Sequence, residues 1–269
     1  MKMNTLLTLN HLLKNMKSDF ICVEGSSIFT QFYHKEYNPD KETIVFLHEA
    51  LGSVAQWRDF PKEVGGKTDF NVLAYDRLGH GLSDAPVKKR DLTYLHTEAW
   101  TALPSVLAAF DIKKPILYGH SDGGSIALLY AARFPTRAII TEAAHVFVES
   151  VTLDGIKQAV TRRDFLIEKL TRFHGNKTPD LWAAWADTWL HKSFETWNIE
   201  AVLNEITCPS LIIQGKNDEY GTAEQVRRIA KGIGENVEIL MLPHCGHAPH
   251  KETQKVVLDN VLKFLTHHV

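Results

Sequence analysis

Short apolar runs alternate with longer segments of helical character along most of this chain. Each run combines β-branched, aromatic and other apolar residues, a composition that favours a β-strand. The runs are FICV (20–23), IFTQFY (28–33), TIVFLH (43–48), NVLAYD (71–76), PILYGH (115–120), AIITEA (138–143), SLIIQG (210–215) and VEILML (237–242). The turn sequence EGSS between the first two predicts an antiparallel hairpin, and the later, continuously apolar runs are typical of strands buried on both faces. The alternation therefore predicts an α/β fold with a mostly parallel eight-stranded sheet and helices on both faces.

One stretch interrupts this rhythm. Residues 148–207 contain no good strand run and only helix-like sequence, with four of the six tryptophans of the chain. We expect an inserted helical cap over one edge of the sheet. The predicted organisation is a core domain made of residues 1–147 and 208–269, with the cap formed by 148–207.

A serine lies between glycines at the junction of a predicted strand and a predicted helix. The pattern is Gly-x-Ser-x-Gly over residues 119–123, centred on Ser121. A sharp strand-to-helix turn crowds the backbone, glycines relieve the crowding, and the serine hydroxyl is then presented at a helix N-terminus that favours a developing anion. The pentapeptide alone equally fits a serine N-cap flanked by loop glycines.

A serine hydroxyl needs a base to act as a nucleophile, and predicted strand ends supply one. His247 lies in the loop after the last strand, and Asp218 lies in the loop after the strand that precedes it. Because the carboxyl ends of parallel strands meet at one edge of a sheet, we expect Ser121, Asp218 and His247 to meet there. The alternatives are His120, His244 or His250 as the base, Glu142 as the acid and Cys245 as a thiol nucleophile. Ser121, Asp218 and His247 are favoured over these alternatives.

These motifs resemble those of the α/β-hydrolase superfamily, and the resemblance covers nearly the whole chain. GHSDGG looks like its nucleophile elbow, GKNDEYGT like its acid loop and HCGHAPHKE like its histidine loop, while YDRLGHGLSDAP is similar to the loop after its fourth strand. The chain looks most like small bacterial serine hydrolases. The resemblance implies a catalytic triad of Ser121, Asp218 and His247, and it implies that the amides of Ala50 and Asp122 form an oxyanion hole.

Glu49 departs from the family pattern, which usually has glycine at this position. The charged side chain stands next to Ala50 in a loop that is expected to be tight. One interpretation is a carboxylate that is turned away and paired, with Arg58 or Arg77 as its partner. The other is that Glu49 shapes the substrate mouth or positions water, and a positive φ at this residue would strain it.

Aromatic residues are candidates for the substrate pocket. Trp182, Trp185 and Trp189 share one face of a helix, which fits either cap packing or a wall over an apolar group, and Trp57 and Phe147 are lesser candidates. Basic residues of the cap could contact a phosphate, but interleaved acidic residues favour a solvated helix face. They are Arg162, Arg163, Lys169, Arg172 and Lys177.

Composition limits the partners. A net charge of −2 gives no reason to expect nucleic acid, and no apolar run reaches the ~18–20 residues of a membrane span. Three scattered cysteines suit a reducing, cytoplasmic compartment, and the first 20 residues are expected to form a short helix or arm rather than a signal peptide. No metal-ligand spacing is present, so we expect no cofactor.

From the residues and the resemblance together, we expect a monomeric or homodimeric serine hydrolase of a small-molecule ester or thioester. The alternatives are carbon–carbon bond hydrolysis of a diketone-type substrate and a ligand-sensing protein with slow turnover.

Overall fold

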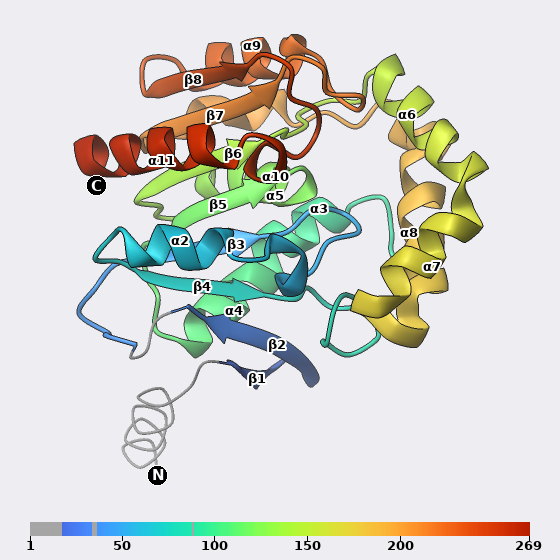
Figure 1. The fold of residues 1–269 in the computed structure, drawn as a ribbon, viewed down its shortest axis with the longest axis horizontal. Coiled ribbons are helices and arrows are strands. Elements are labelled where there is room, and N and C mark those ends of the chain that lie inside the picture. Colours follow the sequence, from blue (N-terminus) through green and yellow to red (C-terminus); the bar gives the residue numbers. More distant parts are fainter. Residues whose placement is uncertain (1–17, 34–36, 88) are drawn as a thin grey trace.

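The computed structural model describes residues 18–33, 37–87 and 89–269. Most of the N-terminal segment that was expected to form a short helix or arm lies outside the described residues. Figure 1 shows one sheet that crosses the molecule, with helices in front of it, behind it and at one side.

The sheet has eight strands, in the spatial order β1-β2-β4-β3-β5-β6-β7-β8. The strands are β1 (Ser18–Val23), β2 (Ser26–Phe32), β3 (Thr43–Leu47), β4 (Asn71–Tyr75), β5 (Ile116–His120), β6 (Ala138–Glu142), β7 (Ser210–Gly215) and β8 (Val237–Leu242). The β1–β2 and β2–β4 pairs are antiparallel and all the others are parallel. The predicted α/β fold and mostly parallel eight-stranded sheet are therefore confirmed.

Burial follows the strand positions. Every residue of β3 to β7 is buried, whereas the edge strand β8 keeps partly exposed residues. Strands covered on both faces can be apolar throughout, which explains why these runs lack the polar alternation of half-exposed strands.

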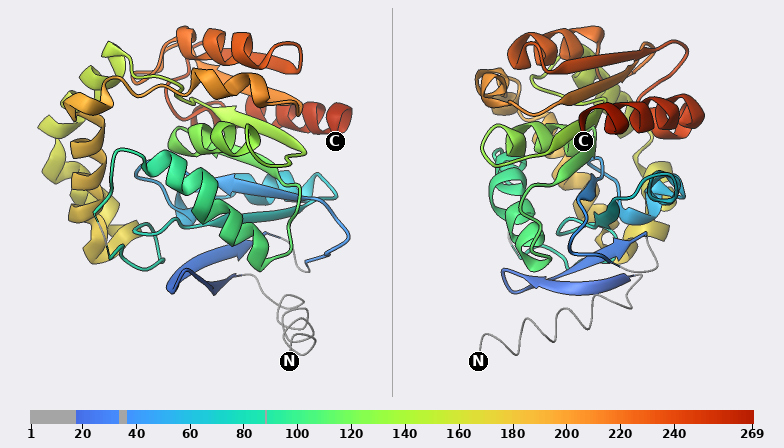
Figure 2. Two further views of the ribbon diagram at one scale, coloured as in Figure 1. Left: turned by 180° about the vertical axis from the view of Figure 1, so that it is seen from behind. Right: turned by 90° about the vertical axis from the view of Figure 1, so that its left-hand side faces the viewer.

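Helices cover both faces of the sheet. Helices α2 and α11 bury one face, and α4, α5 and α9 bury the other, as the end-on view in Figure 2 shows. The α-helices are α2 (Phe60–Gly66), α3 (Tyr94–Thr97), α4 (Leu103–Ala109), α5 (Asp122–Ala131), α6 (Ser150–Thr161), α7 (Arg163–His174), α8 (Thr178–Trp189), α9 (Ala223–Ile233), α10 (Pro249–Glu252) and α11 (Gln254–His268). Short 3₁₀ helices span Val54–Trp57, Gly175–Lys177, Lys192–Phe194 and Glu200–Glu205, and a π-helical turn spans Glu98–Ala102.

Helices α6, α7 and α8, here called the cap helices, stand apart at one side of the molecule (Figure 1). They fall between β6 and β7 in sequence, inside the stretch where a helical insertion was expected. Gly155 of α6 lies so close to the loop after β7 that an added Cβ would stand 2.7 Å from the Glu219 carbonyl oxygen. We propose that these helices form a cap, because they stand over the edge of the sheet where the loops after β5, β7 and β8 meet.

Candidate active site

Ser121 occupies a sharp turn between β5 and α5. Its backbone has φ 54° and ψ −116°, a left-handed conformation that is unusual for a residue with a side chain. A Cβ on Gly119 would stand 2.2 Å from the Gly123 carbonyl oxygen, and one on Gly123 would stand 1.9 Å from the Leu47 carbonyl oxygen. The flanking glycines are therefore required by close backbone approach, and they allow the strained turn that places Ser121 at the start of α5.

The fold brings Ser121, His247 and Asp218 into one chain of hydrogen bonds. His247 Nε2 lies 3.0 Å from Ser121 Oγ, and His247 Nδ1 lies 2.9 Å from both carboxylate oxygens of Asp218. Asp218 also accepts hydrogen bonds from the Tyr220 amide at 2.8 Å and from Gln214 Nε2 at 2.7 Å. The donors fix the carboxylate, which in turn orients the imidazole so that Nε2 can accept the serine proton.

His247 and Asp218 shift each other's pKa in the directions that favour an ion pair. Burial alone lowers the pKa of His247, but the charge and hydrogen bond of Asp218 outweigh it, with a further contribution from the Glu49 charge, and the net pKa is raised above 6.5. Burial raises the pKa of Asp218, but His247 and the Tyr220 amide outweigh it and the net pKa is lowered. The pair is therefore suited to hold a proton on the imidazole while the carboxylate stays ionised.

The two predicted oxyanion donors belong to residues beside the serine. Ala50 and Asp122 both line the same cavity as Ser121. The Asp122 carboxylate is buried, accepts a hydrogen bond from the Tyr94 hydroxyl at 2.8 Å and lies 3.6 Å from Arg77 Nη1. Its negative charge is therefore compensated inside the protein by a neutral donor and a cation.

Glu49 lies at the cavity, but its partner is not the one expected. Its carboxylate is 3.8 Å from Lys251 Nζ, and both side chains are partly exposed, so the interaction is weak. The expected pairing with Arg58 or Arg77 is wrong, because Arg77 uses Nη2 to donate to the Glu49 carbonyl oxygen at 2.7 Å and is committed to Asp122 at Nη1. Glu49 is absent from the described residues with positive φ, so the strain that a positive φ would cause does not arise.

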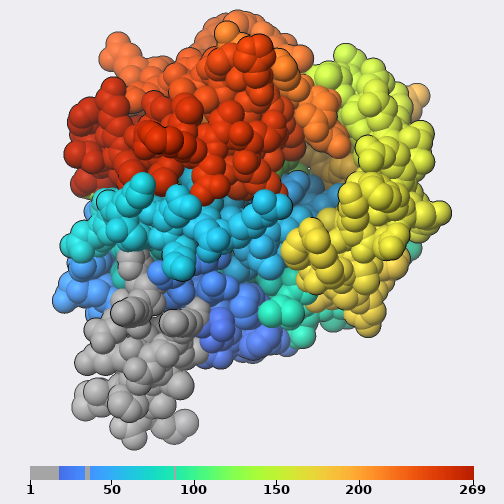
Figure 3. All heavy atoms as spheres, viewed as in Figure 1, coloured from blue at the N-terminus to red at the C-terminus, as the bar shows by residue number. Residues whose placement is uncertain are grey.

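A cavity of about 330 Å³ opens beside the serine, within the size range of small-molecule sites. Its lining combines Ser121 and His247 with the cap tryptophans, and Figure 3 shows a hollow between the yellow-green cap helices and the orange-red C-terminal segments. The lining also includes Glu49, Ala50, Asp122, His145, Ile156, Lys169, Arg172 and Tyr220, and its tryptophans are Trp182, Trp185 and Trp189. The cavity thus places an aromatic wall from α8 and two basic residues of α7 near Ser121.

Two of the pocket candidates do not line this cavity. Trp57 is buried against the aromatic residues of the opposite core cluster, with its ring centroid 5.2 Å from that of Phe46 and 4.5 Å from that of His250. The ring of Phe147 lies under the guanidinium of Arg228 at 3.9 Å, outside the cavity. The other candidates, Glu49, Trp182, Trp185 and Trp189, do line it. The difference arises because Trp57 turns toward the α2 and α11 side of the sheet.

The alternative catalytic residues have other partners. Glu142 is fully buried and accepts from Tyr118 and from His250 Nδ1, so it serves a separate cluster. Burial raises the pKa of Glu142, but His250 outweighs it and the net pKa is lowered. His120 Nε2 lies 2.7 Å from the His247 carbonyl oxygen, so His120 supports the backbone of the loop that carries His247.

Cys245 is buried, and burial raises the pKa of its thiol, which opposes a thiolate nucleophile. Within the described part of the chain, no group of three His, Cys, Asp or Glu residues could hold a metal ion.

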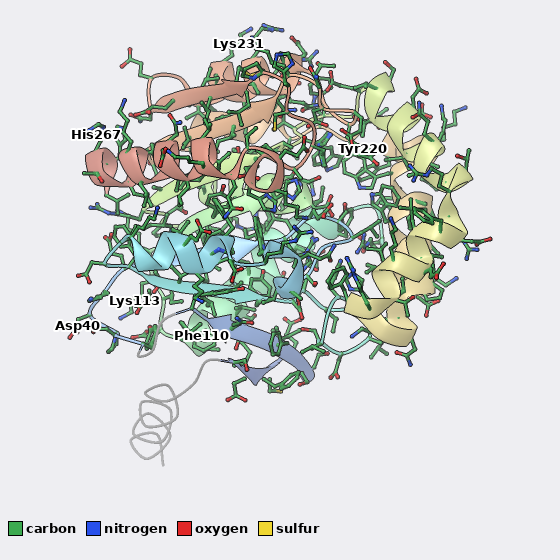
Figure 4. All side chains as sticks on the ribbon, in the orientation of Figure 1. Asp40, Phe110, Lys113, Tyr220, Lys231 and His267 are labelled. Atoms are coloured by element: carbon green, nitrogen blue, oxygen red, sulfur yellow. The ribbon has the colours of Figure 1, made fainter. Side chains whose placement is uncertain are left out.

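Sequence reasoning missed two residues beside the triad. His145 follows β6 and lies 6.1 Å from His247 between ring centroids, and the strand-end rule that located Asp218 would also have located it. Tyr220, labelled in Figure 4 on the side that faces the cap helices, has its ring 4.8 Å from that of His247. Burial and nearby carboxylates raise the pKa of Tyr220 to about 12, so its hydroxyl stays protonated.

Among the described residues, no helix is both long and apolar enough to cross a membrane.

A family model described as "Alpha/beta hydrolase family" matches residues 44–259. The 2-hydroxy-6-oxononadienedioate/2-hydroxy-6-oxononatrienedioate hydrolase of Paraburkholderia xenovorans (strain LB400) is 26% identical over 93% of this chain and 96% of its own length. Human serine hydrolase BPHL is 26% identical over 70% of this chain and 67% of its own length.

Solved structures agree on the fold. The enol-lactonase from Burkholderia xenovorans LB400 matches with a TM-score of 0.74 and 18% identity, covering 92% of this chain and all of that one. The thermophilic esterase from Thermogutta terrifontis matches with a TM-score of 0.72 and 18% identity, covering 94% of this chain and all of that one. The family model spans most of the sequence, and the sheet and its helices are arranged as in these solved structures. This chain therefore belongs to the alpha/beta hydrolase family.

Proposed function

We propose that this protein hydrolyses a small-molecule carbonyl compound through a covalent intermediate on Ser121. The observation that carries the proposal is the continuous hydrogen-bonded chain from Asp218 through His247 to the Ser121 hydroxyl at the wall of a cavity. His247 takes the serine proton as Ser121 Oγ attacks the carbonyl, and the amides of Ala50 and Asp122 stabilise the oxyanion. His247 then gives the proton to the leaving group and activates a water that releases the acid.

The bond that we favour is a carbon–carbon bond next to a ketone. The relatives named as 2-hydroxy-6-oxononadienedioate hydrolases match over 92–93% of this chain. The reacting form of such a substrate is its keto tautomer, in which the carbon next to the ketone is saturated and joined to an alkene conjugated with a second carbonyl. Collapse of the tetrahedral intermediate on that form breaks the carbon–carbon bond, the electron pair delocalises into the second carbonyl, and the released carbon takes the proton of His247. Lys169 and Arg172 at the cavity offer cationic partners to a carboxylate of such a substrate.

A carboxylic ester or thioester is the second candidate, and Glu49 is the observation in its favour. The Glu49 carboxylate lies at the cavity with only a partly exposed partner at 3.8 Å, so it would repel a dianionic substrate more than a neutral ester. The leaving oxygen or sulfur needs only the proton of His247, which the same triad supplies.

A substrate panel separates these candidates. Purified protein is mixed with a 2-hydroxy-6-oxo-dienoate, whose conjugated chromophore disappears on cleavage, and with chromogenic esters and acyl-CoA thioesters of increasing chain length. We expect kcat/KM to be highest for the dienoate, and a higher value for an ester would instead support the second candidate. Burst kinetics with an ester distinguish an enzyme from a ligand-sensing protein with slow turnover.

The control is Ser121→Ala, which keeps the cavity but removes the nucleophile. It should fold normally and lose turnover, with a residual rate of about 10³–10⁴ over water. A serine-directed phosphonate should label the unmodified protein at Ser121 and leave the variant unlabelled. Full activity in Ser121→Ala would refute the mechanism for every substrate.

A further inference from the structure

The loop that carries the predicted oxyanion donor Ala50 is held by side chains from outside the loop. Arg77 Nη2 donates to the carbonyl oxygens of His48 at 3.3 Å and of Glu49 at 2.7 Å. His80 Nε2 lies 3.0 Å from the Ala50 carbonyl oxygen, and His174 Nε2 lies 3.0 Å from that of Leu51. Four successive carbonyls, from residue 48 to residue 51, thus have a side-chain partner.

His174 belongs to the cap, whereas Arg77 and His80 belong to the loop after β4. The His174 side chain is buried, and its Nδ1 accepts a hydrogen bond from the Gly81 amide at 2.9 Å. An imidazole that accepts at Nδ1 carries its proton on Nε2, so His174 donates to the Leu51 carbonyl. Burial lowers the pKa of His174, which favours this neutral form.

The contact with Leu51 is linked to the Ala50 amide through two peptide groups. In a planar trans peptide the carbonyl and the amide point in opposite directions. The Leu51 carbonyl that accepts from His174 shares its peptide with the Gly52 amide, which donates to the Glu49 carbonyl at 3.0 Å. The Glu49 carbonyl in turn shares its peptide with the Ala50 amide. Hydrogen bonds in such a series polarise and orient one another.

We propose that His174 is a positioning residue that links the cap to the oxyanion hole. When the cap is docked, His174 holds the Leu51–Gly52 peptide, and this peptide holds the Glu49–Ala50 peptide with its amide toward the cavity. The inference rests on the proposed function, because it assigns His174 a role in the stabilisation of an oxyanion by Ala50. Its consequence is that the cap contributes to kcat as well as to substrate binding.

Two substitutions separate this role from simple anchoring of the cap. In His174→Gln the amide nitrogen occupies the position of Nε2 and keeps the bond to the Leu51 carbonyl, while the Gly81 amide loses its acceptor. In His174→Asn the amide oxygen occupies the position of Nδ1 and keeps the bond to Gly81, while the Leu51 carbonyl loses its donor. Each variant therefore loses one of the two hydrogen bonds of the same buried side chain.

Lys177→Met is the matched control. Lys177 Nζ donates to the carbonyl oxygens of Gly81 and Ser83, so it ties the cap to the loop after β4 without contacting residues 48–51. All variants are assayed with one chromogenic ester for kcat, KM and thermal stability. The inhibition constant of a boronic acid, whose serine adduct places an oxygen in the oxyanion hole, is measured as an independent readout.

We expect His174→Asn to lower kcat by about 10²-fold and to weaken boronic acid inhibition in parallel with little change in KM, as for a misplaced catalytic group. We expect His174→Gln to keep most of the kcat at similar stability, and Lys177→Met to lose stability but keep kcat. Equal kcat in the two His174 variants, or a loss in Lys177→Met as large as in His174→Asn, would overturn the proposal.

Labelling of the unmodified protein by a phosphonate separates failure of the positioning role of His174 from failure of the proposed function. If Ser121 is labelled and the ester is hydrolysed, the His174 variants test the positioning role alone. If the unmodified protein is neither labelled nor active, the proposed function fails and the role of His174 in it fails too.

Discussion

Replacement of Asp218 by asparagine tests the hydrogen-bonded chain most directly. The carboxylate oxygens receive donors from His247 Nδ1, Gln214 Nε2 and the amides of Tyr220 and Gly221. An asparagine has one acceptor oxygen and brings an NH₂ group, so one of its ends must face a donor. If the asparagine oxygen keeps the hydrogen bonds from the amides of Tyr220 and Gly221, its NH₂ group faces His247 Nδ1 and donates to it. The imidazole then carries its proton on Nε2.

That tautomer cannot accept the proton of Ser121. We expect Asp218→Asn to keep the fold and to lower kcat by about 10⁴-fold, the loss typical of this tautomer change. At 1.36 kcal/mol for each factor of ten, this corresponds to about 5.4 kcal/mol in the barrier. Gln214 could turn its amide to accept from the new NH₂ group, but it would then lose its bond of 3.1 Å to the Gly221 carbonyl, so its rotation does not restore the original geometry without cost.

The assay is single-turnover acylation with a chromogenic ester, together with circular dichroism to verify folding. Glu142→Gln is the control, since it neutralises another buried carboxylate at a strand end. The glutamine keeps a single acceptor oxygen where His250 and Tyr118 each donate to a separate carboxylate oxygen, so we expect reduced stability with kcat retained. A mild effect of Asp218→Asn with a severe effect of Glu142→Gln on kcat would refute this assignment of the acid.

Three other outcomes follow from the site. Because Asp218 and Glu49 raise the pKa of His247, kcat/KM should rise with pH through a value above 6.5 as the imidazole becomes neutral, and a flat profile across that range would contradict the general-base role. Glu49→Gly should shift this limb to lower pH and keep activity on a small ester within about tenfold, a change of ~1.4 kcal/mol, whereas a thousandfold loss with the fold intact would indicate a catalytic carboxylate. Gly123→Ala should destabilise the protein by at least ~1–3 kcal/mol in thermal or urea unfolding, because its Cβ would meet backbone at 1.9 Å, while Gly66→Ala, which meets nothing within 4 Å, should be tolerated.

The strands and the triad could be predicted because each depends on a local signal. Apolar runs mark strands that are buried on both faces, and a parallel sheet brings the residues after its strands to one edge. That rule places Ser121, Asp218 and His247 at one edge without knowledge of any side-chain contact, and the resemblance to α/β-hydrolases favours them over neighbours such as His244 and His250.

The neighbours of the triad could not be predicted in the same way. Whether a tryptophan faces the cavity depends on the direction of its side chain, and the sequence offers both Trp185 and, as a lesser candidate, Trp57. The partner of Glu49 is Lys251, which helix α10 brings near it, and no periodic pattern connects the two. The contact of His174 with Leu51 likewise spans 123 positions and depends on how the cap packs on the core.

The sequence separations within the triad have a consequence for folding. Ser121 and His247 are 126 positions apart, and their loops are adjacent only after β5, β6, β7 and β8 have paired in register. Contacts between distant segments form late and slowly, because the entropy of closing a long loop must be lost before they stabilise the chain. During refolding from urea, helical circular dichroism should therefore recover before the rate of phosphonate labelling at Ser121, and the reagent would report the completion of the C-terminal half of the sheet.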